Sequence, residues 1–273
     1  MAVSITHLNG RPASTEDLAP LAFAGFAHFT AMQVRDRAVR GLDLHLARLR
    51  SASHELFGAH LPEERLREHL LAALSAAPAD VSLTCFITSR PGEFVAPDGG
   101  AELDVLVKVT DPADPPLGPL SLDLVEHERH LPTVKHVGEV SKTLYLRRAH
   151  ARGFDDAAFV DRSGRLSEAT IWNLAFWDGN SVIWPKAAVL PGVTMQILSR
   201  RLHALGVAQR TRPVRPEDLT ERLAAVVLNS WTPAVPVARI GEHRLGDGSE
   251  IVRLLHRAYE TEPIMRVQAL STS

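Results

Sequence analysis

Residues 110–120 read TDPADPPLGPL and hold four prolines and one glycine in eleven positions. Proline fixes its own φ angle and has no backbone N–H to donate, so this stretch continues neither a helix nor a central strand. It therefore divides the chain of 273 residues, which is long enough for two domains. We predict a small N-terminal domain over residues 1–112, a linker over 113–120 and a larger C-terminal domain over 121–273.

The sequence before the linker has the patterns of a small α+β domain. Residues 42–58 carry apolar side chains at helical spacing and end in Gly58, a typical helix stop. Pro62 and the acidic pair behind it open a second predicted helix, which runs through Ala77. The strand-like segments of this half are residues 4–10, 28–42, 81–89 and 102–110.

The sequence after the linker again mixes both kinds of pattern. We predict helices over residues 141–153, 190–206 and 249–259. Strand-like patterns cover residues 120–128, 156–169, 173–185 and 224–240. Two α+β domains favour a ligand site in the cleft between them.

Composition narrows the class of protein. Hydrophobic residues make up 45% and charged residues 23%, which is typical of a folded globular protein. The net charge of −2 argues against a nucleic-acid partner, and no apolar run is long enough to span a membrane. The first ten residues lack the pattern of a signal peptide. A single cysteine, Cys85, allows no internal disulfide, so we expect a soluble, cytoplasmic protein.

Common nucleotide and hydrolase motifs are absent from the sequence. There is no GxxxxGK[ST], no GxGxxG and no GxSxG segment. His127 and His130 lie in HERH, which is not the HExxH pattern of zinc enzymes. We therefore expect no metal site.

Lysine is rare in this chain, and that makes each lysine a candidate for special chemistry. The four lysines are Lys108, Lys135, Lys142 and Lys186, so 26 of the 30 basic residues are arginine. A lysine can lose its proton and form an imine, whereas arginine stays charged. Any one of the four can equally be an ordinary surface lysine.

Four segments combine in order along the chain. They are HLARL with Arg48, VKHVGEV with Lys135, GRLSEATIWNL with Glu168, and VLPGVTMQIL with Gly192, Val193 and Thr194. Together they resemble the motifs of fold-type IV pyridoxal-phosphate enzymes, the class IV aminotransferases. This family includes branched-chain and D-amino-acid aminotransferases and aminodeoxychorismate lyase. The resemblance extends from about residue 22 to about residue 245.

The resemblance implies an architecture and a cofactor. The fold is expected to be α+β, with a small N-terminal α/β sandwich and a larger C-terminal domain that has a β-barrel-like core. The cofactor is expected to be pyridoxal 5′-phosphate, and the protein is expected to be a homodimer. The partners implied are an amino acid and a 2-keto acid, without nucleic acid or membrane.

The family motifs also imply roles for individual residues. Lys135 matches the lysine that forms a Schiff base with the cofactor and then transfers protons. Glu168 matches the carboxylate that keeps the pyridine nitrogen protonated. The phosphate is expected to bind Arg48, the N–H groups of Val193 and Thr194 at a helix start, and the hydroxyl of Ser230. Trp231 and Thr232 match the turn that receives the substrate carboxylate.

Each of these residues also has a purely structural reading. Glu168 can be a plain turn carboxylate, and Arg48 can lie along an amphipathic helix with only its charge in solvent. Lys142 is the rival of Lys135 for the imine, but it precedes Gly153 by 11 positions, whereas Lys135 precedes it by 18, which is the family's spacing. Trp172 and Cys85 are expected to be core residues.

The substrate half of the pattern is unusual. Phe26, Gln33 and Trp172 stand where family members often have an acidic residue, an arginine and another acidic residue. The leading hypothesis is an aminotransferase that moves an amino group between an amino acid or amine and a 2-keto acid. The alternatives are a lyase of the aminodeoxychorismate type, which releases pyruvate, and a catalytically silent homologue that binds a ligand.

Overall fold

The structure is a computed structural model that describes residues 2–22, 24–90 and 101–268. The chain forms two compact units. The N-terminal unit comprises described residues up to 113 together with 134–138 and 263–268, and the barrel unit comprises residues 114–133 and 139–262. The chain first leaves the N-terminal unit inside the proline-rich stretch. Residues 134–138 and 263–268, which we assigned to a domain over 121–273, belong to the N-terminal unit.

Backbone pairing explains why these two segments join the N-terminal unit. The N–H of Phe29 donates to the carbonyl of Lys135 at 2.8 Å, and the N–H of Val137 donates to the carbonyl of Ala27 at 2.9 Å. Strand β16 (Ile264–Arg266) pairs antiparallel with β4 (Ala38–Arg40). These partners are far apart in the sequence, and local periodicity carries no signal for such pairings.

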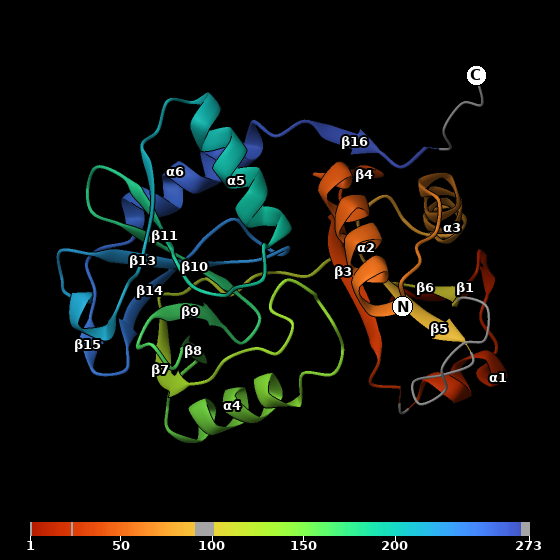
Figure 1. Ribbon diagram of the computed structural model, residues 1–273. Coiled ribbons are helices and arrows are strands. Elements are labelled where there is room, and N and C mark those ends of the chain that lie inside the picture. Colours follow the sequence, from red (N-terminus) through yellow and green to blue (C-terminus); the bar gives the residue numbers. More distant parts are fainter. Residues whose placement is uncertain (1, 23, 91–100, 269–273) are drawn as a thin grey trace. The chain divides into compact units, whose positions relative to one another are not determined.

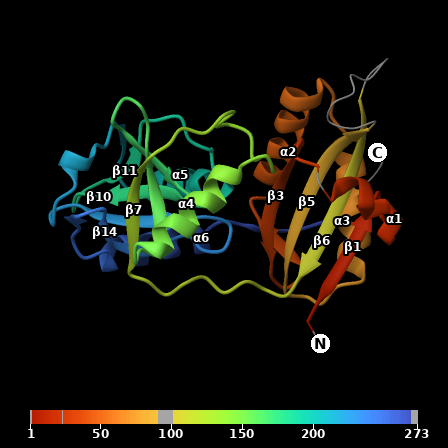
Figure 2. The ribbon, with the colours of Figure 1, turned by 90° about the horizontal axis from the view of Figure 1, so that it is seen from below.

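The N-terminal unit is built on a five-stranded antiparallel sheet of order β2-β1-β6-β5-β3, with neighbouring strands that can be followed in Figure 2. The strands are β1 (Ser4–Leu8), β2 (Arg11–Pro12), β3 (Ala27–Val34), β5 (Val81–Arg90) and β6 (Glu102–Thr110). Two helices, α2 (Leu42–Phe57) and α3 (Glu63–Ser75), pack on this sheet. The short helices α1 (Thr15–Leu18) and η1 (Ala19–Leu21) follow β2.

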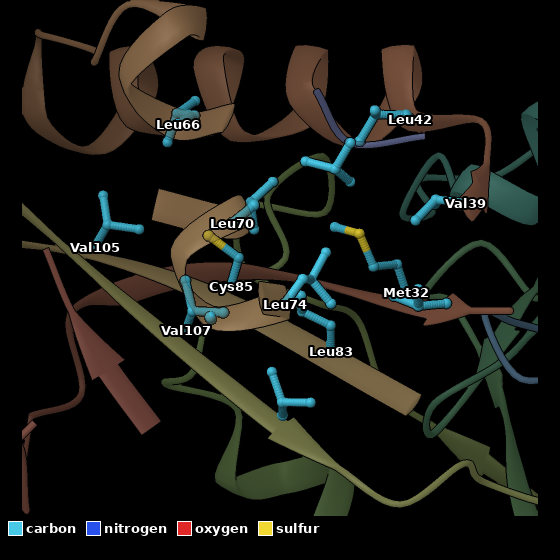
Figure 3. Close-up of a cluster of buried hydrophobic side chains, with 14 of the residues drawn as sticks. Met32, Val39, Leu42, Leu66, Leu70, Leu74, Leu83, Cys85, Val105 and Val107 are labelled. Carbon is cyan, nitrogen blue, oxygen red and sulfur yellow. The ribbon is translucent and has the colours of Figure 1, made fainter. Parts of the chain in front are cut away.

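The core of this unit follows the period of two in its strands. Along β5, Val81, Leu83, Cys85 and Ile87 are buried and alternate with less buried residues. Figure 3 shows Leu83 and Cys85 of this strand in one cluster with leucines of the two helices, Leu42 of α2 and Leu66, Leu70 and Leu74 of α3. Cys85 is fully buried in this cluster, and burial raises the pKa of its thiol to about 12. Cys85 therefore has the properties of an unreactive core residue.

The barrel unit contains a closed six-stranded barrel, which confirms the predicted barrel-like core. Its strands follow one another around the barrel as β10 (Asn173–Trp177), β13 (Ala224–Leu228), β14 (Val235–Ile240), β7 (Leu120–Glu126), β8 (Asp156–Val160) and β9 (Leu166–Ala169). The sheet continues beyond β10 through β11 (Val182–Pro185) and β12 (Gln209–Arg212), and β15 (His243–Arg244) pairs with β14. The helices are α4 (Val140–Ala151), α5 (Val193–Ala204), α6 (Ser249–Glu260) and the short η2 (Pro216–Asp218), most of which are labelled in Figure 1.

Both faces of the central barrel strands are buried. In β13, Ala225 and Val227 belong to one buried cluster, while Val226 and Leu228 belong to a second. The second cluster includes side chains of α5 and α6, which pack against each other beside the sheet. A strand covered on both faces has a continuous apolar sequence, and this explains the run AAVVL at residues 224–228.

Two histidines join α2 to β3 inside the N-terminal unit. His28 Nε2 lies 2.8 Å from Ser53 Oγ, and His45 Nδ1 lies 2.6 Å from Thr30 Oγ1. Burial lowers the pKa of His28 to about 4. Burial, reinforced by the charge of Arg48, lowers the pKa of His45 to about 3. Both rings are therefore neutral in the folded protein near pH 7, where they form these hydrogen bonds.

These two histidines predict acid sensitivity of the N-terminal unit. In the unfolded chain each histidine takes up a proton below about pH 6.5, whereas the folded protein resists protonation down to about pH 4. Each should therefore reduce the free energy of unfolding by up to about 1.4 kcal/mol per pH unit in that window as the pH falls. Urea unfolding at a series of pH values measures this slope. The variant His28→Gln should lower the slope by up to about 1.4 kcal/mol per pH unit, and an unchanged slope would contradict this assignment.

Candidate active site

Lys135 lies on an extended segment at the edge of the N-terminal sheet. The pairing of residues 134–138 with β3 continues the sheet past its last named strand, and His136 forms a bridge with His28. The Lys135 Nζ atom lies 4.8 Å from the centroid of the Phe29 ring. Phe29 in turn packs against Phe86 at a centroid distance of 5.3 Å. Lys135 is therefore held by a strand and placed against an aromatic surface.

Phe29 is a contact of Lys135 that the sequence analysis missed. The alternation in residues 27–34 places Phe29 on the opposite face of β3 from Thr30, which bonds to α2. That alternation could have assigned Phe29 to the face away from α2. Its contact with Lys135 depends on a long-range strand pairing that has no local signal.

Arg48 also lies in the N-terminal unit. It is half-buried on α2, one turn after His45. The two histidine–hydroxyl pairs fix α2 on β3, and β3 also pairs with the Lys135 segment. One strand thus positions both Arg48 and Lys135.

Glu168 is buried in the barrel unit, on β9. Its Oε1 atom accepts a hydrogen bond from Arg129 Nη1 at 3.3 Å and lies 3.8 Å from Lys142 Nζ. Its Oε2 atom accepts a hydrogen bond from the backbone N–H of Leu190 at 3.2 Å. Glu168 is therefore not a solvent-exposed turn carboxylate. The contact with Leu190 joins it to the LPGVT segment, residues 190–194.

Asn173 and Gly192 fix the shape of that segment. The Asn173 side-chain N–H donates to the carbonyl of Leu190 at 2.8 Å. Gly192 lies so close to the Asn173 side chain that a Cβ atom at this position would overlap it. Helix α5 starts directly afterwards at Val193, and among the described residues no side chain caps its N-terminus. The first-turn N–H groups are thus a suitable place for an anion.

The 229–232 turn lies beside this helix start. The Thr194 hydroxyl donates to the carbonyl of Asn229 at 2.8 Å, and the Trp231 N–H donates to Asn229 Oδ1 at 2.8 Å. Ser230 is half-buried and Thr232 is buried. The barrel unit therefore brings together six of the predicted site residues, namely Glu168, Val193, Thr194, Ser230, Trp231 and Thr232. Lys135 and Arg48 belong to the N-terminal unit.

The residues that depart from the family pattern have structural partners. Asp156 is buried and accepts hydrogen bonds from Trp172 Nε1 at 2.9 Å and Thr170 Oγ1 at 2.6 Å, which fixes the turn behind Glu168. Burial raises the pKa of Asp156, although these hydrogen bonds oppose the change. Trp172 also packs edge-to-face on Trp231 at 5.8 Å.

The two departures in the N-terminal unit are also accommodated. Gln33 Oε1 accepts hydrogen bonds from Arg35 Nη2 at 2.8 Å and Ser82 Oγ at 3.1 Å. Phe26 packs edge-to-face on Phe57 of α2 at 5.5 Å.

Comparison with known proteins identifies the family. The sequence profile of the class IV aminotransferase family matches residues 27–240. The chain belongs to this family, as its motifs predicted. This is a family of pyridoxal-phosphate-dependent enzymes, so the expected class of cofactor is confirmed. A search of curated protein sequences found no significant match.

Solved structures of the same fold include two branched-chain aminotransferases. The enzyme from Thermoproteus uzoniensis, solved with norvaline, is 17% identical, with a TM-score of 0.82 over 95% of this chain and 94% of that one. The Escherichia coli enzyme is 18% identical, with a TM-score of 0.82 over 97% and 99%. A protein from Legionella pneumophila described as a 4-amino-4-deoxychorismate lyase is 18% identical, with a TM-score of 0.75 over 85% and 89%. At these identities the similarity shows the fold.

Two further features concern metals and membranes. Within residues 2–22, 24–90 and 101–268, no three His, Cys, Asp or Glu side chains form a group that could hold a metal ion. In the same part of the chain, every helix is too short or too polar to cross a membrane.

The packing of Gly192 against Asn173 yields a testable prediction. The φ angle of Gly192 is −56°, which alanine adopts readily, so Gly192→Ala adds only the overlap with the Asn173 side chain. We expect a loss of about 1–3 kcal/mol in the free energy of unfolding, as for other overpacked sites. Urea unfolding measures it. The double variant Gly192→Ala/Asn173→Ala removes the overlap, so its destabilisation should be smaller than the sum of the two single effects. Strict additivity would show that the two side chains do not compete for this space.

Proposed function

We propose that this protein is a pyridoxal-phosphate-dependent aminotransferase that moves an amino group between an amino acid or amine and a 2-keto acid. The observation that carries the proposal is the contact between Glu168 and Leu190, which links a buried carboxylate to an uncapped helix start. The buried carboxylate suits the protonated pyridine nitrogen of the cofactor, and the N–H groups of the helix start suit its phosphate. The donor set of the barrel unit therefore fits the family's cofactor.

The cofactor would supply an aldehyde that reacts with amines and a ring that accepts electrons. Glu168 would hold the proton on the pyridine nitrogen. The N–H groups of Val193 and Thr194 and the hydroxyl of Ser230 would bind the phosphate, and the family pattern assigns the guanidinium of Arg48 to the same group. Thr194 also fixes the 229–232 turn through its bond to Asn229.

Lys135 is the amine that we assign to the cofactor aldehyde and to proton transfer at the substrate carbon. The contacts of the rival lysine support this choice. Lys142 Nζ lies 3.2 Å from Glu139 Oε2 and 3.8 Å from Glu168 Oε1, so this amine is engaged in ion pairs with two carboxylates. Lys135 lies on a strand edge, with its Nζ atom against the ring of Phe29, and it has the family's spacing to Gly153.

On the substrate side, we assign the carboxylate of the amino acid to the turn of Trp231 and Thr232. Trp231 keeps 40% of its surface exposed and packs on Trp172, so this turn presents an aromatic surface beside its polar groups. As the family resemblance implies, we propose a homodimer in the cytoplasm as the working state.

Covalent capture of the cofactor tests the assignment of Lys135. Sodium borohydride reduces the carbon–nitrogen double bond between lysine and pyridoxal 5′-phosphate, so the label stays on the lysine that formed it. Peptide mass mapping should find the label on Lys135, and Lys135→Ala should abolish both the label and the yellow colour. The matched control is Lys186→Ala, which removes an exposed lysine and should change neither. A label on Lys142 in the parent protein would refute the assignment.

The second candidate is a lyase of the aminodeoxychorismate type. It is favoured by His136 directly after Lys135, because the lyases often carry the motif KHxNR and this chain reads KHVGE at residues 135–139, and by the fold shared with the Legionella protein. The amino acceptor separates the two reactions, because an aminotransferase requires a 2-keto acid. Consumption of amino donors only in the presence of a 2-keto acid supports the aminotransferase. Release of pyruvate from aminodeoxychorismate without any keto acid would establish the lyase, and cofactor binding without either reaction would indicate a silent homologue.

A further inference from the structure

Four charged side chains are buried together around the carboxylate of Glu168. The exposed fraction of the side chain is 2% for Arg129, 4% for Glu168, 10% for Glu139 and 16% for Lys142. We call these residues the charge quartet. All four belong to the barrel unit.

Each cation of the charge quartet contacts both carboxylates. Arg129 Nε lies 2.7 Å from Glu139 Oε1, and Arg129 Nη1 lies 3.3 Å from Glu168 Oε1. Lys142 Nζ lies 3.2 Å from Glu139 Oε2 and 3.8 Å from Glu168 Oε1. The group is electrically neutral as a whole. Neutrality matters here because an unpaired buried charge is strongly destabilising.

The electrostatics of Glu139 agree with this geometry. Burial alone raises the pKa of Glu139, but the positive charges of Lys142 and Arg129 outweigh burial and bring it below its ordinary value. Glu139 is thus the negative partner that balances a second buried cation.

The position of Lys142 in its helix calls for an explanation. Lys142 lies in the first turn of α4, which begins at Val140, and a cation there opposes the helix dipole. Local helix energetics therefore disfavour this lysine. Its two carboxylate contacts supply the compensating interaction, and one of them is with the residue that we assign to the pyridine nitrogen.

We propose that Lys142 is a positioning residue for the cofactor site, which together with Arg129 holds Oε1 of Glu168 in place before the cofactor arrives. This inference rests on the proposed function, because it takes Glu168 as the partner of the pyridine nitrogen. Oε1 faces the two cations and Oε2 accepts the Leu190 N–H. The carboxylate is thereby fixed from both sides, and the cofactor does not have to reorient it.

The quartet also connects two parts of the proposed site along the chain. Glu139 and Lys142 sit at the start of α4, directly after the segment that carries Lys135. Their contacts with Arg129 and Glu168 tie this helix start to β9. Lys142 therefore acts on Glu168 through position and charge, while Lys135 forms the covalent bond.

The test compares three variants of the full-length apoprotein, with pyridoxal 5′-phosphate as the probe. Lys142→Met removes the charge, Lys142→Arg restores a cation, and Lys142→Met/Glu139→Gln removes the charge but keeps the quartet neutral. The control Arg162→Met breaks an exposed ion pair with Glu128 in the same unit. The readouts are the dissociation constant from absorbance titration, the position of the absorption band of the bound cofactor, and the melting temperature of the apoprotein.

We expect Lys142→Met to weaken cofactor binding by about tenfold or more, in line with the loss of a charge-assisted contact. Its absorption band should also shift, because the charge around the pyridine nitrogen has changed. Lys142→Arg should recover most of the affinity. The double variant should recover the melting temperature but not the affinity, and Arg162→Met should match the parent protein.

Three results would overturn the inference. They are unchanged affinity and absorption in Lys142→Met, failure of Lys142→Arg to recover any affinity, and full recovery of affinity in the double variant, which would make Lys142 only the counterion of Glu139. If Lys142→Met does not fold, the other two variants decide the question. Borohydride labelling of Lys135 in the parent protein is independent of these outcomes, so its failure would remove the proposed function itself.

Discussion

The pairing of Glu168 with Asn173 is the contact on which the barrel and the candidate site both depend. These residues lie opposite each other where β9 meets β10, and this pairing closes the six-stranded barrel. They also hold the same residue of the LPGVT segment, since Glu168 accepts the N–H of Leu190 and Asn173 donates to its carbonyl. Closing the barrel therefore places the start of α5 next to a buried carboxylate.

Burial determines the electrostatics of this region. A carboxylate that is 3% exposed as a whole residue needs partners, and Glu168 has two cations and a backbone N–H. The second carboxylate, Glu139, makes the group neutral. Elsewhere in the unit, Asp156 meets the same requirement with neutral donors, the hydroxyl of Thr170 and the indole of Trp172. Trp172, which differs from the branched-chain pattern, thus donates a hydrogen bond to the buried carboxylate of Asp156 on β8.

In the N-terminal unit, the single strand β3 positions both residues that we assign to the proposed site, Lys135 and Arg48. β3 pairs with the Lys135 segment on its free edge, presents Phe29 to that lysine, and bonds through Thr30 and His28 to the helix that carries Arg48. Neutral, buried histidines join the helix and the strand at pH 7 without introducing charge into the core. Both of the residues that this unit supplies to the proposed site are therefore positioned by β3.

The sequence by itself determined the local structure and the family. The period of two in residues 81–89 and the helical spacing and Gly58 in residues 42–58 were enough to predict α+β units. The resemblance of the four ordered motifs to fold-type IV enzymes implied the barrel-like core and the class of enzyme. Only the tertiary structure decided that residues 134–138 lie with the N-terminal unit, that Phe29 lies against Lys135, and that Lys142 is engaged by two carboxylates. Helical and strand periods arise from neighbours along the chain, and these contacts join residues from separate elements, so no local pattern records them.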